Sequence, residues 1–201
     1  MKLISPNEAI KIGLDKYLEY YKKAVQEFWQ FEKSINNIPI EHYFIAQAVQ
    51  ESRFNANAKS PVGALGIAQF MPFTAKEVGQ ELKGYQLFKN GFDPLNDIQS
   101  VYAQVYYMNK LFRSWKVERT ALEKFELALA SYNAGLGNIL KAQKLSGNQR
   151  KWNDIKKYLE SVTGRNSLET INYVEYIKGY VLRVKNSVTR CVTKNTKKNT
   201  I

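Results

Sequence analysis

Glu51 is the residue in this chain whose position suggests chemistry. Phe44, Ala48 and Glu51 follow one another at helical spacing, so a predicted helix carries this carboxylate on its apolar face. Because apolar neighbours exclude water, they disfavour the charged form and raise the pKa of the carboxyl group. Asn55 and Pro61 predict that the helix ends just beyond Glu51, so the negative end of the helix dipole raises the pKa further. Such a carboxyl group holds a proton near neutral pH and can act as a general acid.

The same spacing fits a second interpretation, in which Glu51 lies at the edge of the apolar stripe and reaches water as part of a structural network. A glycine-rich segment follows the helix, with Gly63 and Gly66 ahead of Gln69. Glycine allows the backbone either a tight turn or a close approach to a ligand. The segment therefore predicts irregular backbone or short strands beside the carboxylate.

The sequence offers no second chemical group of comparable clarity. Cys191 is the single cysteine and His42 the single histidine, which excludes an intrachain disulfide and a cluster of soft zinc ligands. The sequence contains no acidic calcium loop, P-loop or dinucleotide-binding fingerprint. We therefore expect chemistry without a cofactor and without a metal ion.

Helices predicted along the rest of the chain would position this segment. Ser5 and Pro6 begin a long amphipathic helix that ends between Ser34 and Pro39. The last helix begins near Ser167 and ends near Ser187. Apolar residues at helical spacing predict further helices at 73–78, 94–115, 120–134 and 152–162.

Three blocks of the sequence resemble the signature motifs of the soluble lytic transglycosylases, which are related to goose-type lysozyme. They lie in the family's order at residues 51–72, 130–135 (Ala-Ser-Tyr-Asn-Ala-Gly) and 169–174 (Glu-Thr-Ile-Asn-Tyr-Val). Family members usually have Leu-Met where this chain has Ile67-Ala68, a change that affects one apolar sugar contact rather than the chemistry. Three ordered blocks are much more specific than any one of them.

The resemblance implies a mainly α (α+β), lysozyme-like fold: a helical bundle with a small irregular or β segment beside the cleft. It also implies a peptidoglycan lytic transglycosylase with Glu51 as its single catalytic residue. Such an enzyme cleaves the β-1,4 bond between MurNAc and GlcNAc without water and leaves a 1,6-anhydroMurNAc end. The substrate-binding residues implied by the motifs are Ser60, Gln69, Tyr132, Asn133, Glu169 and Tyr173.

Two alternatives to this activity remain. Hydrolytic glycosidases usually need two carboxylates, and only Glu51 has a motif around it. A goose-type muramidase that hydrolyses the same bond is one alternative, and a glycan-binding module without catalysis is the other.

The net charge of +12 indicates an anionic partner, which nucleic acid, anionic lipid and cell-wall polymers would all satisfy. Because the lysines are scattered over predicted helix surfaces, we expect no nucleic-acid partner. Peptidoglycan glycan strands are the expected partner, and the chain is expected to be a monomer.

The N-terminal residues lack the apolar core of a signal peptide, and no stretch is long enough to span a bilayer. We therefore expect synthesis in the cytoplasm and action in the periplasm or cell wall. A bacteriophage endolysin released through a holin, or a virion-associated enzyme, fits this combination. We predict a single catalytic domain at 1–188, with an N-terminal helical extension at about 1–38, and a disordered basic tail at 189–201.

Overall fold

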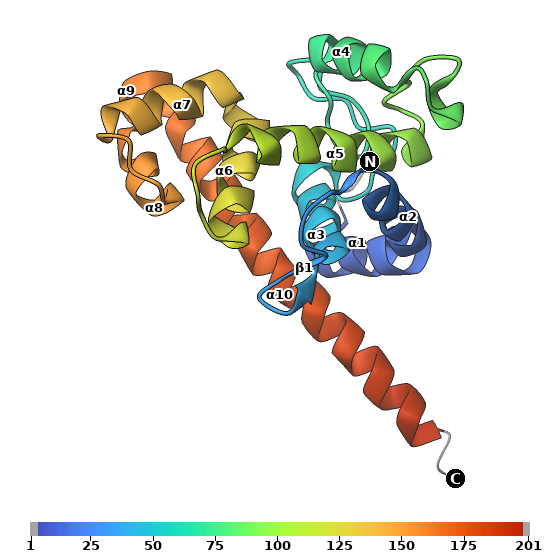
Figure 1. Cartoon of the computed structure of the whole chain (residues 1–201). Helices are drawn as coiled ribbons and strands as arrows, with labels where there is room; N and C mark the ends of the chain where they lie inside the picture. Colours follow the sequence, from blue (N-terminus) through green and yellow to red (C-terminus); the bar gives the residue numbers. More distant parts are fainter. Residues whose placement is uncertain (1–3, 199–201) are drawn as a thin grey trace.

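A long helix, α5 (Asp97–Ser114), crosses the middle of the computed structural model, and the other helices lie around it (Figure 1). The structure describes the backbone of residues 4–198 and the side chains of residues 4–189. An aromatic cluster joins the helices at the centre. The Trp29 ring lies 5.3 Å from that of Phe44 and 5.0 Å from that of Phe112. These contacts hold α5 against the helix that carries Glu51, α3 (Ile40–Ser52).

The N-terminal helices pack against α3, α5 and α10 (Ser167–Lys198). Ser5 caps α1 (Pro6–Ile12) through a capping box, as the sequence predicts. A π-helical turn, η1 (Gly13–Tyr17), joins α1 to α2 (Leu18–Phe28), so the predicted long helix is interrupted once and ends at Phe28.

A two-stranded hairpin occupies residues 34–39, where we predicted only the end of a helix. Its strands are β1 (Ser34–Ile35) and β2 (Ile38–Pro39), paired antiparallel. Asn36 and Asn37 both have positive φ, the conformation that a two-residue hairpin turn needs. The two asparagines were therefore a turn signal rather than a helix end.

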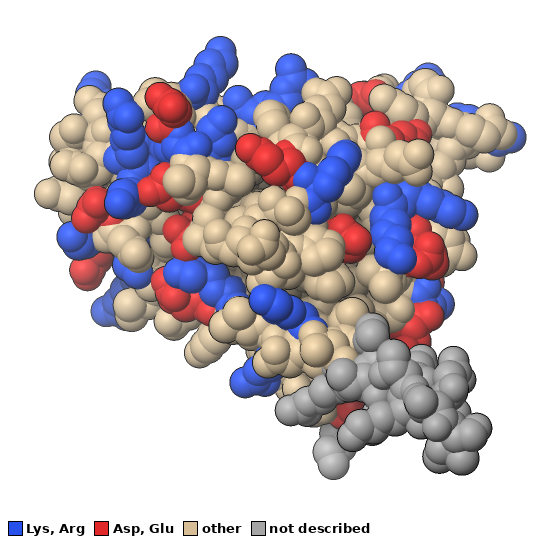
Figure 2. Space-filling view, turned by 60° about the horizontal axis from the view of Figure 1, so that its bottom comes forward, with Lys and Arg blue, Asp and Glu red and all other residues tan. Residues whose placement is uncertain are grey.

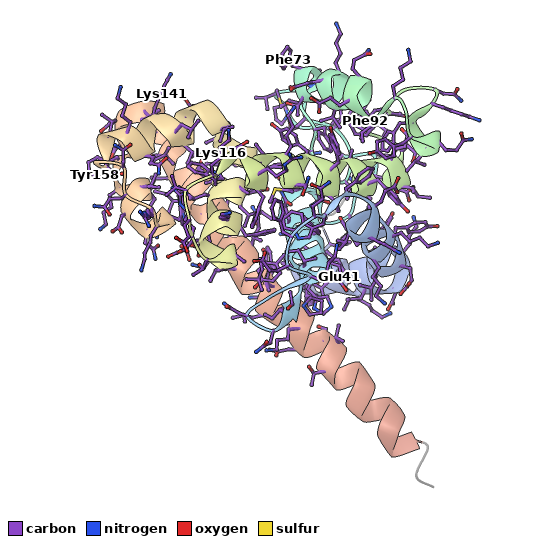
Figure 3. The ribbon with its side chains drawn as sticks, viewed as in Figure 1. Glu41, Phe73, Phe92, Lys116, Lys141 and Tyr158 are labelled. Atoms are coloured by element: carbon purple, nitrogen blue, oxygen red, sulfur yellow. The ribbon has the colours of Figure 1, made fainter. Side chains whose placement is uncertain are left out.

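Most of the remaining elements pack around α3, α6 and α10. Helix α3 packs against α10 and α2, and α6 packs against α5, α7 and α10. Phe73 and Phe92, labelled in Figure 3, lie on the lobe that contains α4. In chain order these elements are α3 (Ile40–Ser52), α4 (Pro72–Leu82), η2 (Gln86–Phe88), α6 (Ala121–Ala134), α7 (Leu136–Leu145), α8 (Trp152–Ile155), η3 (Lys156–Tyr158), α9 (Glu160–Thr163), η4 (Gly164–Asn166) and α10 (Ser167–Lys198).

Residues 53–71 form an irregular loop with two isolated β-bridges, between Lys59 and Leu65 and between Leu65 and Phe70. Gly66 has φ of +75°, and a Cβ on it would lie 1.8 Å from the carbonyl oxygen of Pro94. Only glycine fits there without moving the backbone. The predicted small irregular or β segment is thus confirmed.

Helix α10 is longer than predicted. It runs diagonally across the molecule and extends away from it at its C-terminal end (Figure 1), reaching Lys198 instead of ending near Ser187. No glycine or proline follows Gly179, and adding residues to an existing helix is easier than starting one. The predicted disordered tail is therefore wrong for the backbone of 189–198, and its last residues, 199–201, lie outside the described part.

Among residues 4–198, no helix has both the length and the apolar character needed to cross a membrane. Figure 2 shows lysines and arginines spread over one face of the molecule, with acidic side chains between them. This distribution matches the scattered basic residues noted in the sequence.

Candidate active site

All seven residues that the sequence singled out line one cleft of about 490 Å³. The cleft is formed by the end of α3, the loop at 53–71, the end of α6 and the start of α10. Elements more than 100 residues apart in the sequence therefore meet at Glu51. The seven residues are Glu51, Ser60, Gln69, Tyr132, Asn133, Glu169 and Tyr173.

Glu51 lies in the last turn of α3, which ends with Arg53 in the left-handed conformation. The side chain is half-buried, and its Oε1 accepts a hydrogen bond from the hydroxyl of Tyr173 at 2.5 Å. Burial raises the pKa of Glu51 to about 8; the Tyr173 hydrogen bond lowers this pKa and the charge of Glu169 raises it. Glu51 thus keeps a proton near neutral pH, as we inferred from its place on the apolar stripe.

The loop beside Glu51 is held by hydrogen bonds to its own backbone. Ser60 Oγ accepts from the backbone N–H of Ala64 at 2.9 Å, and Gln69 Nε2 donates to the carbonyl of Gly66 at 2.9 Å. Both side chains are half-buried in the cleft wall. These hydrogen bonds fix the loop, and the atoms of both side chains that face the cleft can still contact a substrate.

Tyr132 joins this loop to α6. Its hydroxyl donates to the backbone carbonyl of Ala68 at 2.6 Å, and burial and the charge of Glu51 raise the Tyr132 pKa well above its usual value. Tyr132 lines the cleft as the sequence indicated, but its proton is already committed to the loop rather than aimed at Glu51.

Asn133 joins the second sequence block, 130–135, to the third, 169–174. Its Oδ1 accepts from the hydroxyl of Thr170 at 2.7 Å, and its Nδ2 donates to Glu169 at 3.4 Å. Thr170 is buried, whereas Glu169 is exposed. This pairing sets the end of α6 against the start of α10, where both present polar groups to the cleft.

The groove continues past Glu51. A second hollow of about 480 Å³ shares Gln50, Glu51 and Tyr176 with the cleft and is bounded on its far side by Asn55 and Tyr180. An elongated ligand can therefore pass over Glu51 and extend on both sides of it. Gln50 and Tyr176 also line the cleft and were not predicted from the sequence. Tyr176 lies one helical turn after Tyr173, a spacing that places it on the cleft side, whereas no periodic signal marks Gln50.

Within the described residues, no three His, Cys, Asp or Glu side chains lie close enough together to hold a metal ion. The chemical group at the centre of the groove is a single protonated carboxyl with a hydroxyl donor at its side. That arrangement can give a proton to a leaving oxygen and hold the resulting carboxylate through the Tyr173 hydrogen bond.

The raised pKa of Glu51 makes stability depend on pH. Between about pH 4.5 and 8 the unfolded chain loses this proton while the folded chain keeps it, so the free energy of unfolding falls as pH rises. Because glutamine does not ionise, we expect Glu51→Gln to be more stable than the parent by roughly 2–4 kcal/mol at pH 9. At pH 4.5 the two proteins should be nearly equal. Urea unfolding at both pH values measures this, and an equal difference at pH 4.5 and 9 would contradict the assignment.

Comparison with known proteins identifies a family and relatives to which this chain is similar. A family model described as "Transglycosylase SLT domain" matches residues 27–155. The membrane-bound lytic murein transglycosylase F of Photobacterium profundum is 31% identical over 188 residues, which cover 86% of this chain and 32% of that protein. Its counterpart in Shewanella halifaxensis is 32% identical over 150 residues, covering 67% of this chain and 29% of that protein. The chain thus spans about a third of the length of these relatives.

Solved structures match the fold. The 70 kDa soluble lytic transglycosylase of Escherichia coli superposes with a TM-score of 0.63 at 23% identity, over 86% of this chain and 24% of that one. An inactive mutant of the lytic transglycosylase Slt from Pseudomonas aeruginosa gives a TM-score of 0.60 at 20% identity, over 87% of this chain and 24% of that one. At these identities the matches show the fold alone, and they confirm the predicted fold class.

Proposed function

This chain belongs to the transglycosylase SLT domain family, and we propose that it is a peptidoglycan lytic transglycosylase that acts through Glu51. The observation that carries the proposal is the protonated, half-buried carboxyl of Glu51 at the middle of a groove open on both sides. A groove of this form suits a polymer, and the relatives are named as murein transglycosylases.

In the proposed reaction, Glu51 first gives its proton to the oxygen that links MurNAc to GlcNAc. The bond from the muramyl C1 to that oxygen breaks, and the GlcNAc side leaves with a new hydroxyl. The Glu51 carboxylate then takes the proton from the muramyl C6 hydroxyl as its oxygen bonds to C1. The product ends in a 1,6-anhydro ring, Glu51 regains its proton, and no water is consumed.

Because the attacking oxygen belongs to the substrate, the protein's task is to hold the sugar ring in the reactive orientation. Ser60, Gln69 and Asn133 are placed around Glu51 to do so, and Tyr173 stabilises the carboxylate between the two proton transfers. Glu169 and Tyr132 complete the wall of the same cleft.

Substitution of Glu169 distinguishes this mechanism from hydrolysis. It is the other carboxylate that lines the cleft, so a muramidase would use it to activate water. In the transglycosylase mechanism it is dispensable, and we expect Glu169→Gln to retain activity within about tenfold. Because this change removes a negative charge that raises the Glu51 pKa, the alkaline limb of the pH–rate profile should move to lower pH.

Release of soluble fragments from purified peptidoglycan by Glu169→Gln measures the first expectation, and the pH profile of that release measures the second. A loss of a thousandfold or more would favour the hydrolytic muramidase. Binding to peptidoglycan without any fragment release by the parent chain would favour the glycan-binding module.

For the biological setting, we propose that the chain opens the wall of a bacterial host for a phage. The net charge of +12 supports attraction to an anionic wall. The relatives are bacterial proteins, so wall remodelling within a bacterium is the alternative. Expression in a bacterial cytoplasm with and without a holin tests the setting: lysis that needs the holin supports it, and lysis without the holin contradicts it.

A further inference from the structure

A chain of buried hydrogen bonds leads from the core to Glu51. The hydroxyl of Tyr21 on α2 donates to Gln104 Oε1 on α5 at 2.7 Å, and Gln104 Nε2 donates to Gln47 Oε1 on α3 at 2.9 Å. Gln47 Nε2 then donates to the hydroxyl oxygen of Tyr173 on α10 at 3.0 Å, and Tyr173 donates to Glu51 at 2.5 Å. The chain crosses four helices and ends at the reactive carboxyl.

The two glutamines have no contact with solvent. Gln47 and Gln104 are both 0% exposed, and Tyr21 is 0% exposed as well. A buried amide costs free energy unless its hydrogen bonds are made, and two apolar side chains would fill the same space without that requirement. The amide nitrogen and the amide oxygen of both side chains each have a hydrogen-bond partner, so the network is built as a unit.

One backbone carbonyl determines the direction of every hydrogen bond in this series. Gln104 Nε2 also donates to the carbonyl oxygen of Phe44 at 3.2 Å, and a carbonyl can only accept. The amide group of Gln104 must therefore face Phe44 and Gln47, which leaves its oxygen for Tyr21. Gln47 in turn presents its oxygen to Gln104 and its amide protons to Tyr173. The hydroxyl proton of Tyr173 is then free to go only toward Glu51.

We propose that Gln47 and Gln104 are positioning residues for Glu51, which fix the hydroxyl of Tyr173 as a donor to the Glu51 carboxylate. Their role in catalysis rests on the function proposed above, whereas their effect on the Glu51 carboxyl does not. Every donor in the chain points toward Glu51, so the bonds polarise one another in the same sense. The network thus stabilises the anion that Glu51 becomes after it gives up its proton.

The surroundings of Glu51 allow this contribution to be isolated. Glu169 and Tyr173 on α10 and Tyr132 on α6 are the titratable groups that act on it or are acted on by it. Arg53, just after α3, donates to the backbone carbonyl of Ile4, and Gln69 on the loop is neutral. Of these groups, Tyr173 has the hydrogen bond to Gln47, so Gln47 acts on Glu51 through Tyr173.

The test is a titration of the Glu51 carboxyl by carbon-13 NMR, with the signal identified by its loss in Glu51→Gln. Gln47→Met keeps the length of the side chain and removes its donor, so the Tyr173 hydroxyl is no longer fixed. We expect the Glu51 pKa to rise by about one unit, a tenfold change in the ionisation equilibrium. An unchanged pKa in folded Gln47→Met would overturn the proposal.

Asn109→Ala is the matched control, because Asn109 is a buried amide on α5 that accepts from the backbone N–H of Gln30 and has no link to Glu51. It should leave the Glu51 titration unchanged. Tyr173→Phe should raise the Glu51 pKa, and adding Gln47→Met to it should raise it no further. Additive shifts would mean that Gln47 does not act through Tyr173, which also overturns the proposal.

If Gln47→Met does not fold, an NMR measurement on the parent protein still tests the proposal. The side-chain amide protons of Gln47 should give nuclear Overhauser contacts to the ring and hydroxyl of Tyr173. Contacts to Gln104 instead would mean that the hydrogen bonds run in the opposite direction, which would refute the proposal. The titration needs no substrate, so it is independent of whether the chain cleaves peptidoglycan. In an active chain, the alkaline limb of the pH profile should follow the same shift.

Discussion

Glu51→Gln is expected to lower the rate of peptidoglycan cleavage by about a thousandfold or more. Glutamine has no proton to give to the leaving oxygen and no carboxylate to take the proton of the attacking hydroxyl, so both steps lose their catalyst. The amide oxygen can still accept the hydroxyl of Tyr173, so the cleft should keep its shape. The release of soluble fragments from purified peptidoglycan, at equal protein concentration, measures the change.

Glu41→Gln is the control for this experiment. Glu41, labelled in Figure 3, lies in the first turn of α3, at the other end of the helix from Glu51. It is not among the residues that line the cleft. The same exchange of a carboxyl group for an amide should leave the rate within about twofold at Glu41, since surface charges of this kind act weakly on a distant site. Near-normal cleavage by Glu51→Gln would remove Glu51 from its proposed role.

Gly66→Ala is expected to damage the loop that forms one wall of the cleft. Gly66 has φ of +75°, and an added Cβ would lie 1.8 Å from the carbonyl oxygen of Pro94. Pro94 must move away or the loop must leave its place, so we expect the free energy of unfolding to fall by about 2 kcal/mol or more. Cleavage should fall as well, because Gln69 lies on the same loop and donates to the Gly66 carbonyl.

Urea unfolding and fragment release measure the two effects, with Gly137→Ala as the control. Gly137 lies in α7 and has no heavy atom within 4 Å of an added Cβ. Alanine there should stabilise the helix by about 0.5–1 kcal/mol and leave cleavage unchanged. If Gly66→Ala were as stable and as active as Gly137→Ala, the close approach of the loop to Pro94 would not hold in solution.

Local patterns predicted the elements of the site well. The spacing of Phe44, Ala48 and Glu51 placed the carboxylate at the end of a helix, because helical periodicity and a helix end are properties of a few neighbouring residues. The same applies to the cap of α1 at Ser5 and to the irregular loop around Gly66. The resemblance to a family then indicated which distant segments meet in one cleft.

Long-range pairs could not be predicted in this way. Gln47 and Gln104 are 57 residues apart, and each sits in an ordinary helical segment, so nothing local showed that they pair. Tyr132 was expected to bind substrate, and only the tertiary structure shows that its hydroxyl is committed to the carbonyl of Ala68. The length of α10 was missed for a related reason, since a polar composition does not end a helix that packing has already started.

The sugar end left on cleaved peptidoglycan tests the central claim most directly. Purified glycan strands digested by the chain should carry 1,6-anhydroMurNAc at the new end, lighter by one water than a reducing end when measured by mass spectrometry. That product requires the muramyl C6 hydroxyl to have attacked C1 with a single carboxyl serving both proton transfers. Reducing MurNAc ends would contradict the account and would mean that water, activated by a second group, is the attacking species.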